Sequence, residues 1–181
     1  MIKNFLISGS GGQGVLSIGT ILANIFMLSD KFVSFSPCYG AEMRGGAVNC
    51  EVNVSDEELL CLQNEKVDIV VALNQLSLDK FISKVKENGI IIVNSSLAEI
   101  KKIRTDIKYI SIPFTQKAIE LGNIKIANSI ALGVISNLMG KFSIDNVKKA
   151  YEKILKNKTE LVQKNIEAYL CGLNYIQEGA W

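Results

Sequence analysis

The stretch GSGGQG, residues 9–14, places four glycines between the apolar runs NFLIS and VLSIGTILANIFML. The first run predicts a strand and the second a helix, so the glycines fall at a strand-to-helix turn. Gly9, Gly11 and Gly14 satisfy the GxGxxG spacing. Glycines there allow a tight turn and let an anion approach the N–H groups at the helix N-terminus. The turn therefore predicts contact with a dinucleotide, with another phosphate, or with a neighbouring protein segment.

A second test argues against the dinucleotide. Dinucleotide sites normally hold the ribose with an Asp or Glu at the end of the second strand. Here the second predicted strand, 32–36, is followed by Pro37, and Asp30 precedes it in the helix-to-strand turn. No Gly-Lys-Ser/Thr follows the glycines, so the turn is not a P-loop either. Another phosphate and a protein contact remain open.

The second unusual stretch is CYGAEMRGGAVNCEV, residues 38–52, between two predicted strands. Glu42 and Arg44 are bracketed by Gly40 and the pair Gly45-Gly46. Arginine presents a rigid donor fork that suits phosphate or carboxylate, and the glycines would let a partner come close. The alternative is an exposed ion pair in a long turn, which would contribute little.

Composition excludes several classes of chemistry. The chain has 181 residues, a net charge of +2, 48% apolar residues and 21% charged residues, which is typical of a folded globular protein. There is no histidine, which excludes Ser/His and Cys/His catalysis, and the four cysteines have no CxxC spacing. We expect free buried thiols, no metal, no nucleic acid and a cytoplasmic location. The uncharged run 4–29 is interrupted by polar residues and is too short in its apolar part to span a membrane.

Hydrophobic periodicity predicts one α/β domain over 1–181 with a helical C-terminal flank. Alternation or continuous apolar runs predict strands at 3–8, 32–36, 47–55, 67–73, 90–94 and 109–113. Helical patterns predict helices at 14–28, 75–89, 128–140, 143–157 and 159–175.

Taken together, GSGGQGVLSIGTILA and the later YGAEMRGGAVNCEVNVSDEEL resemble the gamma subunit of the 2-oxoacid:ferredoxin oxidoreductases. NSIALGVI resembles the family's Asn-containing helix start, and NIEAYLCG resembles its final helix. The resemblance covers about 1–172. AEMRGGAVNCEV is more similar to the 2-oxoglutarate type than to the pyruvate or indolepyruvate types.

The resemblance implies a Rossmann-like three-layer sandwich with a mostly parallel central sheet. In this family the alpha and beta subunits bind thiamine diphosphate, and the beta subunit carries an iron–sulfur cluster. A ferredoxin-like delta subunit is often present. The complex oxidatively decarboxylates a 2-oxoacid to an acyl-CoA and passes two electrons to ferredoxin. The gamma subunit packs on that core and is thought to help form the coenzyme A site.

We therefore expect no catalytic residue in this chain, and no cofactor bound by the chain alone. The candidate residues for coenzyme A or partner contact are Gly9, Gly11, Gly12, Gln13 and Gly14 in the turn, Tyr39, Glu42, Arg44, Gly45 and Gly46 in the second loop, and Asn128. Asn128 has an alternative role as the N-cap of its helix. Two other functions stay open: a stand-alone nucleotide-binding oxidoreductase, and a structural subunit without a ligand site. An isolated chain could also bury its partner-facing surface by forming a homodimer.

Overall fold

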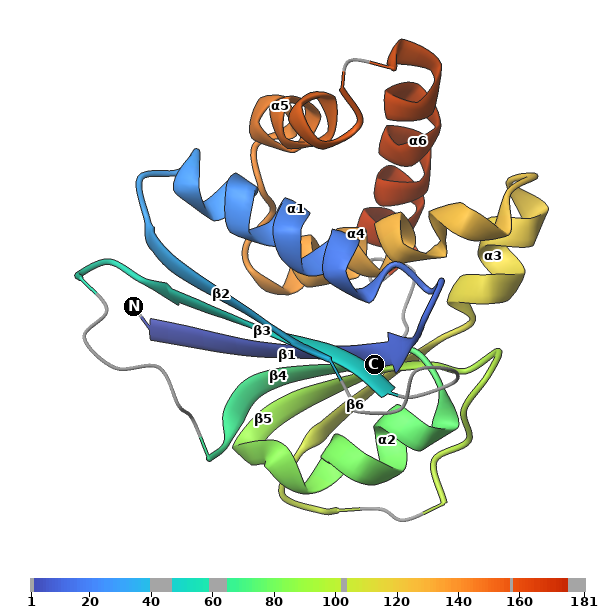
Figure 1. Cartoon of the computed structure of the whole chain (residues 1–181). Coiled ribbons are helices and arrows are strands. Elements are labelled where there is room, and N and C mark those ends of the chain that lie inside the picture. Colours follow the sequence, from blue (N-terminus) through green and yellow to red (C-terminus); the bar gives the residue numbers. More distant parts are fainter. Residues whose placement is uncertain (1, 40–46, 59–64, 102–103, 157, 176–181) are drawn as a thin grey trace.

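A six-stranded sheet forms the centre of the computed structural model, which describes residues 2–39, 47–58, 65–101, 104–156 and 158–175. Its strand order is β2-β3-β1-β4-β5-β6 (Figure 1). β1 pairs in parallel with β4, β4 with β5, and β5 with β6, whereas β3 is antiparallel to both β1 and β2. Only β3 therefore runs against the others, and the predicted mostly parallel sheet is confirmed. The strands are β1 (Ile2–Ser10), β2 (Phe32–Tyr39), β3 (Ala47–Ser55), β4 (Val67–Ala72), β5 (Val85–Asn94) and β6 (Lys108–Ile112).

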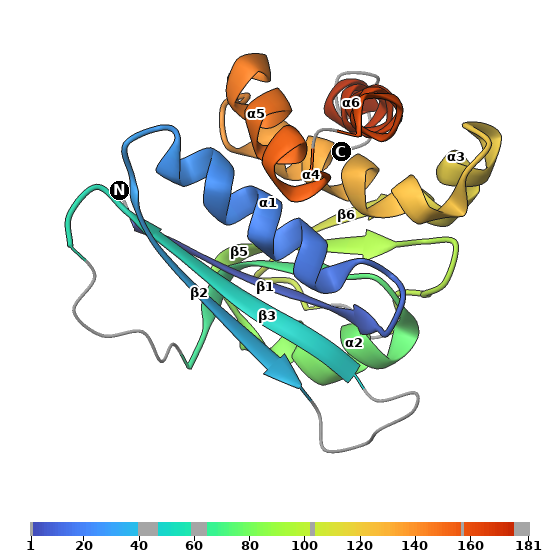
Figure 2. The same cartoon turned by 45° about the horizontal axis from the view of Figure 1, so that its top comes forward.

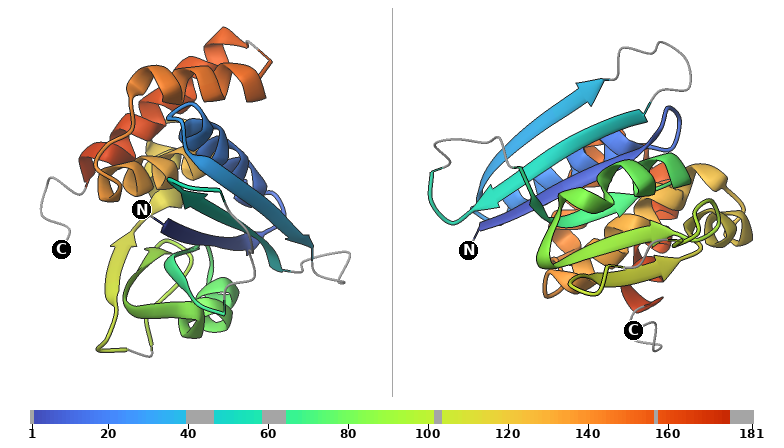
Figure 3. Two further views of the ribbon diagram at one scale, coloured as in Figure 1. Left: turned by 90° about the vertical axis from the view of Figure 1, so that its left-hand side faces the viewer. Right: turned by 90° about the horizontal axis from the view of Figure 1, so that it is seen from below.

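Helices cover the two faces of this sheet unequally. α1, α4, α5 and α6 lie on one face and α2 lies on the other, beneath β4 and β5 (Figures 1 and 3). The predicted helical C-terminal flank is confirmed as α4 to α6. The helices are α1 (Val15–Met27), α2 (Gln75–Phe81), α3 (Phe114–Glu120), α4 (Ala127–Leu138), α5 (Ile144–Ile154) and α6 (Thr159–Tyr175), with short 3-10 turns η1 (Ile82–Lys84) and η2 (Ile124–Ile126).

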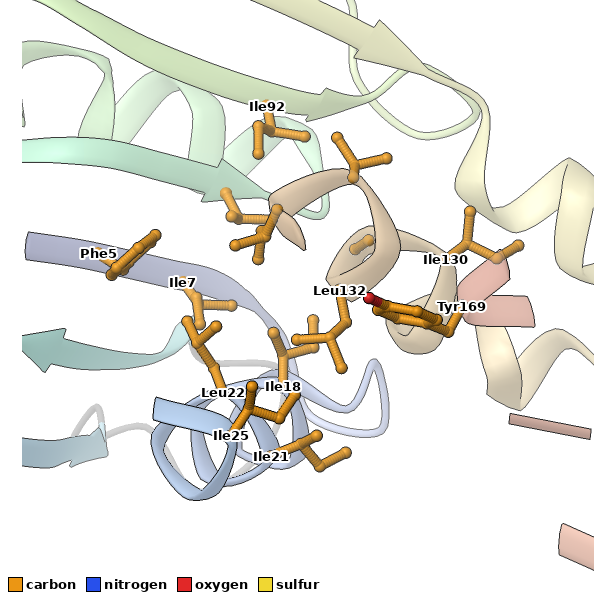
Figure 4. Close-up of a cluster of buried hydrophobic side chains, with 14 of the residues drawn as sticks. Phe5, Ile7, Ile18, Ile21, Leu22, Ile25, Ile92, Ile130, Leu132 and Tyr169 are labelled. Carbon is orange, nitrogen blue, oxygen red and sulfur yellow. The ribbon is translucent and has the colours of Figure 1, made fainter. Parts of the chain in front are cut away.

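Alternation along β1 explains why the sheet has a core on both faces. Phe5 and Ile7 point toward α1 and join the larger core, whereas Leu6 joins the smaller core under α2. On α1 the residues at the helical period, including Ile18 and Leu22, are buried against the same cluster. Figure 4 shows these side chains meeting those of α4 and α6, so the C-terminal helices complete the core that α1 begins.

One predicted boundary was wrong. The apolar pattern predicted a single helix over 75–89, but α2 ends at Phe81 and the chain already enters β5 at Val85. Between the pairs Val67–Val85 and Ile69–Ile90 the register shifts, and Asn88 there takes a φ of 60°. This irregular start of β5 ends in Gly89, where an added methyl would lie 2.8 Å from the carbonyl oxygen of Lys86. The lysines and glycine that resemble a helix C-terminus thus belong to a bulged strand.

Two tyrosines are buried among the C-terminal helices, and they differ in the hydrogen bonding of their hydroxyl groups. The Tyr169 hydroxyl lies 2.6 Å from Ser136 Oγ, which also accepts a bond from the N–H of Phe142 at 2.8 Å. Tyr151 is equally buried, and its hydroxyl lies near Ser129 without a hydrogen bond of ordinary geometry within the described residues, because the Ser129 hydroxyl donates to Asn165 Oδ1. Burial raises the pKa of both phenols, so both are neutral at physiological pH.

These environments predict opposite results for the same substitution. We expect Tyr169→Phe to lower the free energy of unfolding by roughly 1–2 kcal/mol, because a made hydrogen bond is lost. We expect Tyr151→Phe to leave it unchanged or raise it by up to about 1 kcal/mol, because a buried, unbonded hydroxyl is removed. Urea unfolding of the two variants checks this, and a larger loss for Tyr151→Phe would contradict it.

Candidate functional site

The glycine turn joins the end of β1 to the start of α1. Gly12 and Gly14 have φ angles of 90° and 75°, in the left-handed region that favours glycine. Gly14 occupies the N-cap position of α1, and its carbonyl accepts a hydrogen bond from the N–H of Ile18. A methyl group added at Gly11 or Gly12 would meet nothing within 4 Å, whereas Gly9 and Gly14 are closely packed. The turn therefore has two exposed glycines held between two packed ones.

The side chain of Gln13 stabilises this turn by hydrogen bonds. Its Oε1 accepts bonds from the N–H of Ser10 at 2.6 Å and from Asn74 Nδ2 at 3.0 Å. Its Nε2 donates to the carbonyl oxygen of Leu73 at 3.2 Å. The amide thus links the turn after β1 to the segment after β4, and both of its polar atoms have partners inside the chain.

Asn74, in the segment after β4, adds hydrogen bonds to the same turn. Its Nδ2 also donates to Ser10 Oγ at 2.8 Å, while its Oδ1 caps α2 by accepting the N–H of Ser77 at 2.9 Å. Below it, Ser8 Oγ donates to Ser77 Oγ at 2.9 Å. The start of α2 and the glycine turn are consequently held together by side chains of β1 and of the segment after β4.

A crevice of about 220 Å³ opens beside the turn. It is lined by residues that follow the carboxyl ends of the four parallel strands: Gly12 and Gln13 after β1, Leu73 after β4, Asn94 and Leu97 at β5, and Phe114 and Thr115 after β6. Ile124, Lys125, Ala127 and Asn128 close it from η2 and α4. β1 and β4 are neighbours whose following helices lie on opposite faces (Figure 2). This is a topological switch point, where open α/β sheets bind ligands.

A second hollow, of about 380 Å³, lies on the outer side of the turn. It is lined by the turn itself, by the first residues of α1 and by Val48 of β3: Ser10, Gly11, Gly12, Gly14, Val15, Leu16, Ser17 and Val48. The first turn of α1 carries no acidic residue, so its N–H groups offer a site for negative charge. We name the two spaces the inner crevice and the outer hollow.

The predicted site residues fall into three groups. Gly11, Gly12 and Gly14 line the outer hollow, Gly12 and Gln13 line the inner crevice, and Gly9 is buried. Asn128 lines the inner crevice, and its Nδ2 would be 2.6 Å from a methyl added at Gly14. α4 begins at Ala127 with Ile126 in the N-cap position, so Asn128 is not the N-cap of its helix. Tyr39 is the last residue of β2 and pairs with Val48, but its side chain lies outside the described residues. Glu42, Arg44, Gly45 and Gly46 also lie outside them.

Sequence reasoning missed Asn74, Asn94, Thr115 and Lys125. The first three share a signal that could have found them, because each is a polar residue at or just after the carboxyl end of an apolar strand. Asn94 Nδ2 donates to the carbonyl oxygen of Leu73 and to Thr115 Oγ1, which joins the ends of β4, β5 and α3. Lys125 has no comparable signal, since it reaches the crevice only through the path of η2.

The predicted buried thiol is present at Cys50, but the prediction is wrong for Cys38, which is exposed. Burial raises the pKa of the Cys50 thiol to about 12, so it stays protonated under α1. Among the residues that the structure describes, no three His, Cys, Asp or Glu side chains gather in a way that could hold a metal. Within the same residues, none of the helices combines the length and apolarity that crossing a bilayer requires.

Comparison with known sequences gives a consistent assignment. The family described as pyruvate ferredoxin/flavodoxin oxidoreductase matches residues 4–175. The chain is 35% identical over 181 residues to the 2-oxoglutarate synthase subunit KorC of Methanocaldococcus jannaschii, covering 98% of this chain and 96% of that protein. It is 32% identical over 174 residues to the ketoisovalerate oxidoreductase subunit VorA of Methanothermobacter marburgensis, covering 95% of this chain but only 36% of VorA.

The similar solved structures likewise include a chain of about the same length as this one and a much longer chain. A keto/oxoacid ferredoxin oxidoreductase gamma subunit from Geobacter sulfurreducens is similar over its whole length, with a TM-score of 0.83, 27% identity, and coverage of 100% and 99% of the two chains. A 2-oxoglutarate:ferredoxin oxidoreductase from Magnetococcus marinus, with 2-oxoglutarate, coenzyme A and succinyl-CoA bound, gives a TM-score of 0.89 and 25% identity. There the match covers 98% of this chain and 31% of the larger one. The same unit thus occurs as a separate chain and within longer ones.

Proposed function

Because the chain belongs to the pyruvate ferredoxin/flavodoxin oxidoreductase family, we propose that it is the gamma-type subunit of a 2-oxoglutarate:ferredoxin oxidoreductase. The complex would convert 2-oxoglutarate and coenzyme A to succinyl-CoA and carbon dioxide, and pass two electrons to ferredoxin. The observation that carries the proposal is the end-to-end match to a 2-oxoglutarate synthase subunit of similar length. The absence of histidine from the chain agrees with an accessory role.

The cofactors of the reaction belong to partner chains in this proposal. The alpha and beta subunits would supply thiamine diphosphate and an iron–sulfur cluster, and a ferredoxin-like delta subunit would complete the complex. This chain would contribute binding and orientation. In this proposal the chain has no activity without those partners, because they hold the cofactors for decarboxylation and electron transfer.

We place the coenzyme A contact in the outer hollow. The N–H groups at the start of α1 face a space that a phosphate could enter, and Gly11 and Gly12 leave that space free of side chains. β2 ends and β3 begins beside this hollow, since Tyr39 pairs with Val48 and Ala47 pairs with Ser10. The described residues on both sides of segment 40–46 thus border this hollow, and Arg44, which the sequence predicts as an anion contact, is the cation that we propose for the phosphate.

The test uses the reconstituted complex and a matched pair of glycine variants. Gly12 and Gly140 have φ angles of 90° and 83°, and a methyl added at either meets nothing within 4 Å. Alanine should therefore cost about the same at both positions, roughly 1–2 kcal/mol of unfolding free energy. Gly12→Ala adds its methyl beside the outer hollow, whereas Gly140→Ala changes the turn after α4.

We expect Gly12→Ala to raise the KM for coenzyme A at least roughly tenfold, with subunit assembly retained, because the methyl obstructs the approach of the ligand. Gly140→Ala should leave that KM unchanged. If the two variants have the same KM for coenzyme A, the proposal that coenzyme A binds in the outer hollow is wrong. Failure of the chain to copurify with thiamine-binding and iron–sulfur subunits would remove the subunit assignment itself.

A further inference from the structure

The inner crevice has mainly apolar walls. Leu73, Leu97, Phe114, Ile124 and Ala127 line it. Phe114 is fully buried, but Leu97 and Ile124 expose 46% and 57% of their surface. Large aliphatic side chains on the rim of a recess would be covered by the body of an apolar ligand, which stabilises binding by removing that surface from water.

Two polar side chains of the crevice already have their partners. Asn94 uses its amide protons on the carbonyl oxygen of Leu73, at 3.1 Å, and on Thr115 Oγ1, at 3.0 Å. Gln13 uses its oxygen on two donors and its nitrogen on the same Leu73 carbonyl. These two amides shape the crevice and hold its strand ends together, which leaves ligand binding to other groups.

The remaining polar side chains of the crevice, Thr115, Asn128 and Lys125, can each donate a hydrogen bond. The Thr115 hydroxyl accepts from Asn94 and keeps its own proton available. Among the described residues Asn128 Nδ2 has no acceptor, and Asn128 Oδ1 lies 3.4 Å from Ser129 Oγ, which donates its proton to Asn165 Oδ1 at 2.6 Å. The ammonium of Lys125 likewise has no partner in the described part of the chain, and no carboxylate from that part lines the crevice. Residues that carry a hydroxyl, an amide and an ammonium thus line a space to which the described part of the chain contributes no carboxylate.

We propose that the inner crevice binds a small aliphatic carboxylate. Its two oxygens accept hydrogen bonds from Thr115 and Asn128 and are attracted by Lys125, while its hydrocarbon chain lies against Leu97, Phe114 and Ile124. The start of α4 adds a favourable dipole, because Asn128 lies in the first turn of a 12-residue helix with no acidic residue there. An amine would be repelled by the Lys125 ammonium, and a neutral alcohol would gain no charge attraction from it.

The volume sets the size of this ligand. At about 30 Å³ for each water-sized group, 220 Å³ accommodates roughly seven non-hydrogen atoms. That is the size of a five-carbon monocarboxylate and is far below that of coenzyme A. The glycine turn lies between this site and the outer hollow, with Gly12 in the lining of both. The carboxylate is titrated without coenzyme A, so the result does not depend on where coenzyme A binds.

The test is a titration of the full chain followed by backbone amide chemical shifts. Pentanoate is compared with 1-pentanol and pentylammonium, which carry the same hydrocarbon chain. We expect pentanoate to give saturable shifts at Thr115, Lys125 and Asn128, 1-pentanol to bind at least about tenfold more weakly, and pentylammonium to give no shifts there.

Three variants assign the contacts, and a fourth, Lys66→Met, serves as the control. Thr115→Val, Asn128→Ala and Lys125→Met should each raise the dissociation constant for pentanoate, by about tenfold for the first two. Lys125 and Lys66 are both exposed, but Lys66 precedes β4 at the opposite end of the sheet, so Lys66→Met should have no effect. Shifts that do not saturate, equal binding of the alcohol, or unchanged binding by all three crevice variants would overturn the proposal.

Discussion

Alanine at Gly133 or Gly172 should lower the free energy of unfolding by at least about 3 kcal/mol, the largest loss that we expect from a single added methyl group. Gly133 lies in α4 and Gly172 in α6, where the two helices cross at backbone contact. A methyl at Gly133 would overlap the carbonyl oxygen of Tyr169, and one at Gly172 would overlap that of Ile130. Backbone atoms cannot rotate away as a side chain can, so the helices must separate.

Separation would spread into the core. Ile130 and Tyr169 are fully buried at this crossing, and both belong to the cluster that contains α1 and β1 (Figure 4). Overpacking of a core usually costs about 1–3 kcal/mol, and a clash with main chain belongs at the upper end or beyond. Gly140→Ala is the control, because it changes a glycine just after α4 with open space around it. If urea unfolding gives Gly133→Ala and Gly172→Ala free energies of unfolding within about 1 kcal/mol of the wild type, the close crossing of the two helices is contradicted.

These two glycines show where sequence reasoning ends. The segment NSIALGVISNLMG reads as a helix rich in small residues, and the helix is present as α4. Which small residue meets another backbone depends on where Tyr169 and Gly172 of α6 lie, more than thirty residues after Gly133 in the chain. Periodicity within one helix does not carry that information, so the helix could be predicted but its crossing point could not.

The same distinction holds at the candidate site. The strand, the glycine turn and α1 were predicted because their signals are local: an apolar run, a glycine cluster and a helical stripe. The inner crevice was not predicted, because Asn94 and Thr115 reach Gln13 only when four parallel strands end at one edge. The expected helix over 75–89 failed for a related reason, since pairing with β4 extended β5 backward through Lys86 to Val85. Tertiary pairing there overrode a weak local preference.

Gly14→Ala should combine local strain with a specific clash, and a double-mutant cycle can separate the two. Gly14 has a φ of 75°, where a side chain costs roughly 1–2 kcal/mol. Its added methyl would also lie 2.6 Å from Asn128 Nδ2 and 3.0 Å from Asn128 Cβ. We therefore expect Gly14→Ala to lower the free energy of unfolding by roughly 2–4 kcal/mol, more than Gly12→Ala, whose methyl meets nothing.

Asn128→Ala removes the amide from the clash but keeps the Cβ, so it should restore part of the loss and leave the left-handed strain. The free energy lost by the double variant should then be smaller than the sum of the single losses by about 1 kcal/mol or more. Gly12→Ala paired with Asn128→Ala should be additive, because a methyl at Gly12 has no contact with that side chain. An additive result for the Gly14 pair would mean that the turn and the start of α4 are not in contact. Coupling found for the Gly14 pair alone would show that Asn128 contacts the glycine turn from the side of the inner crevice.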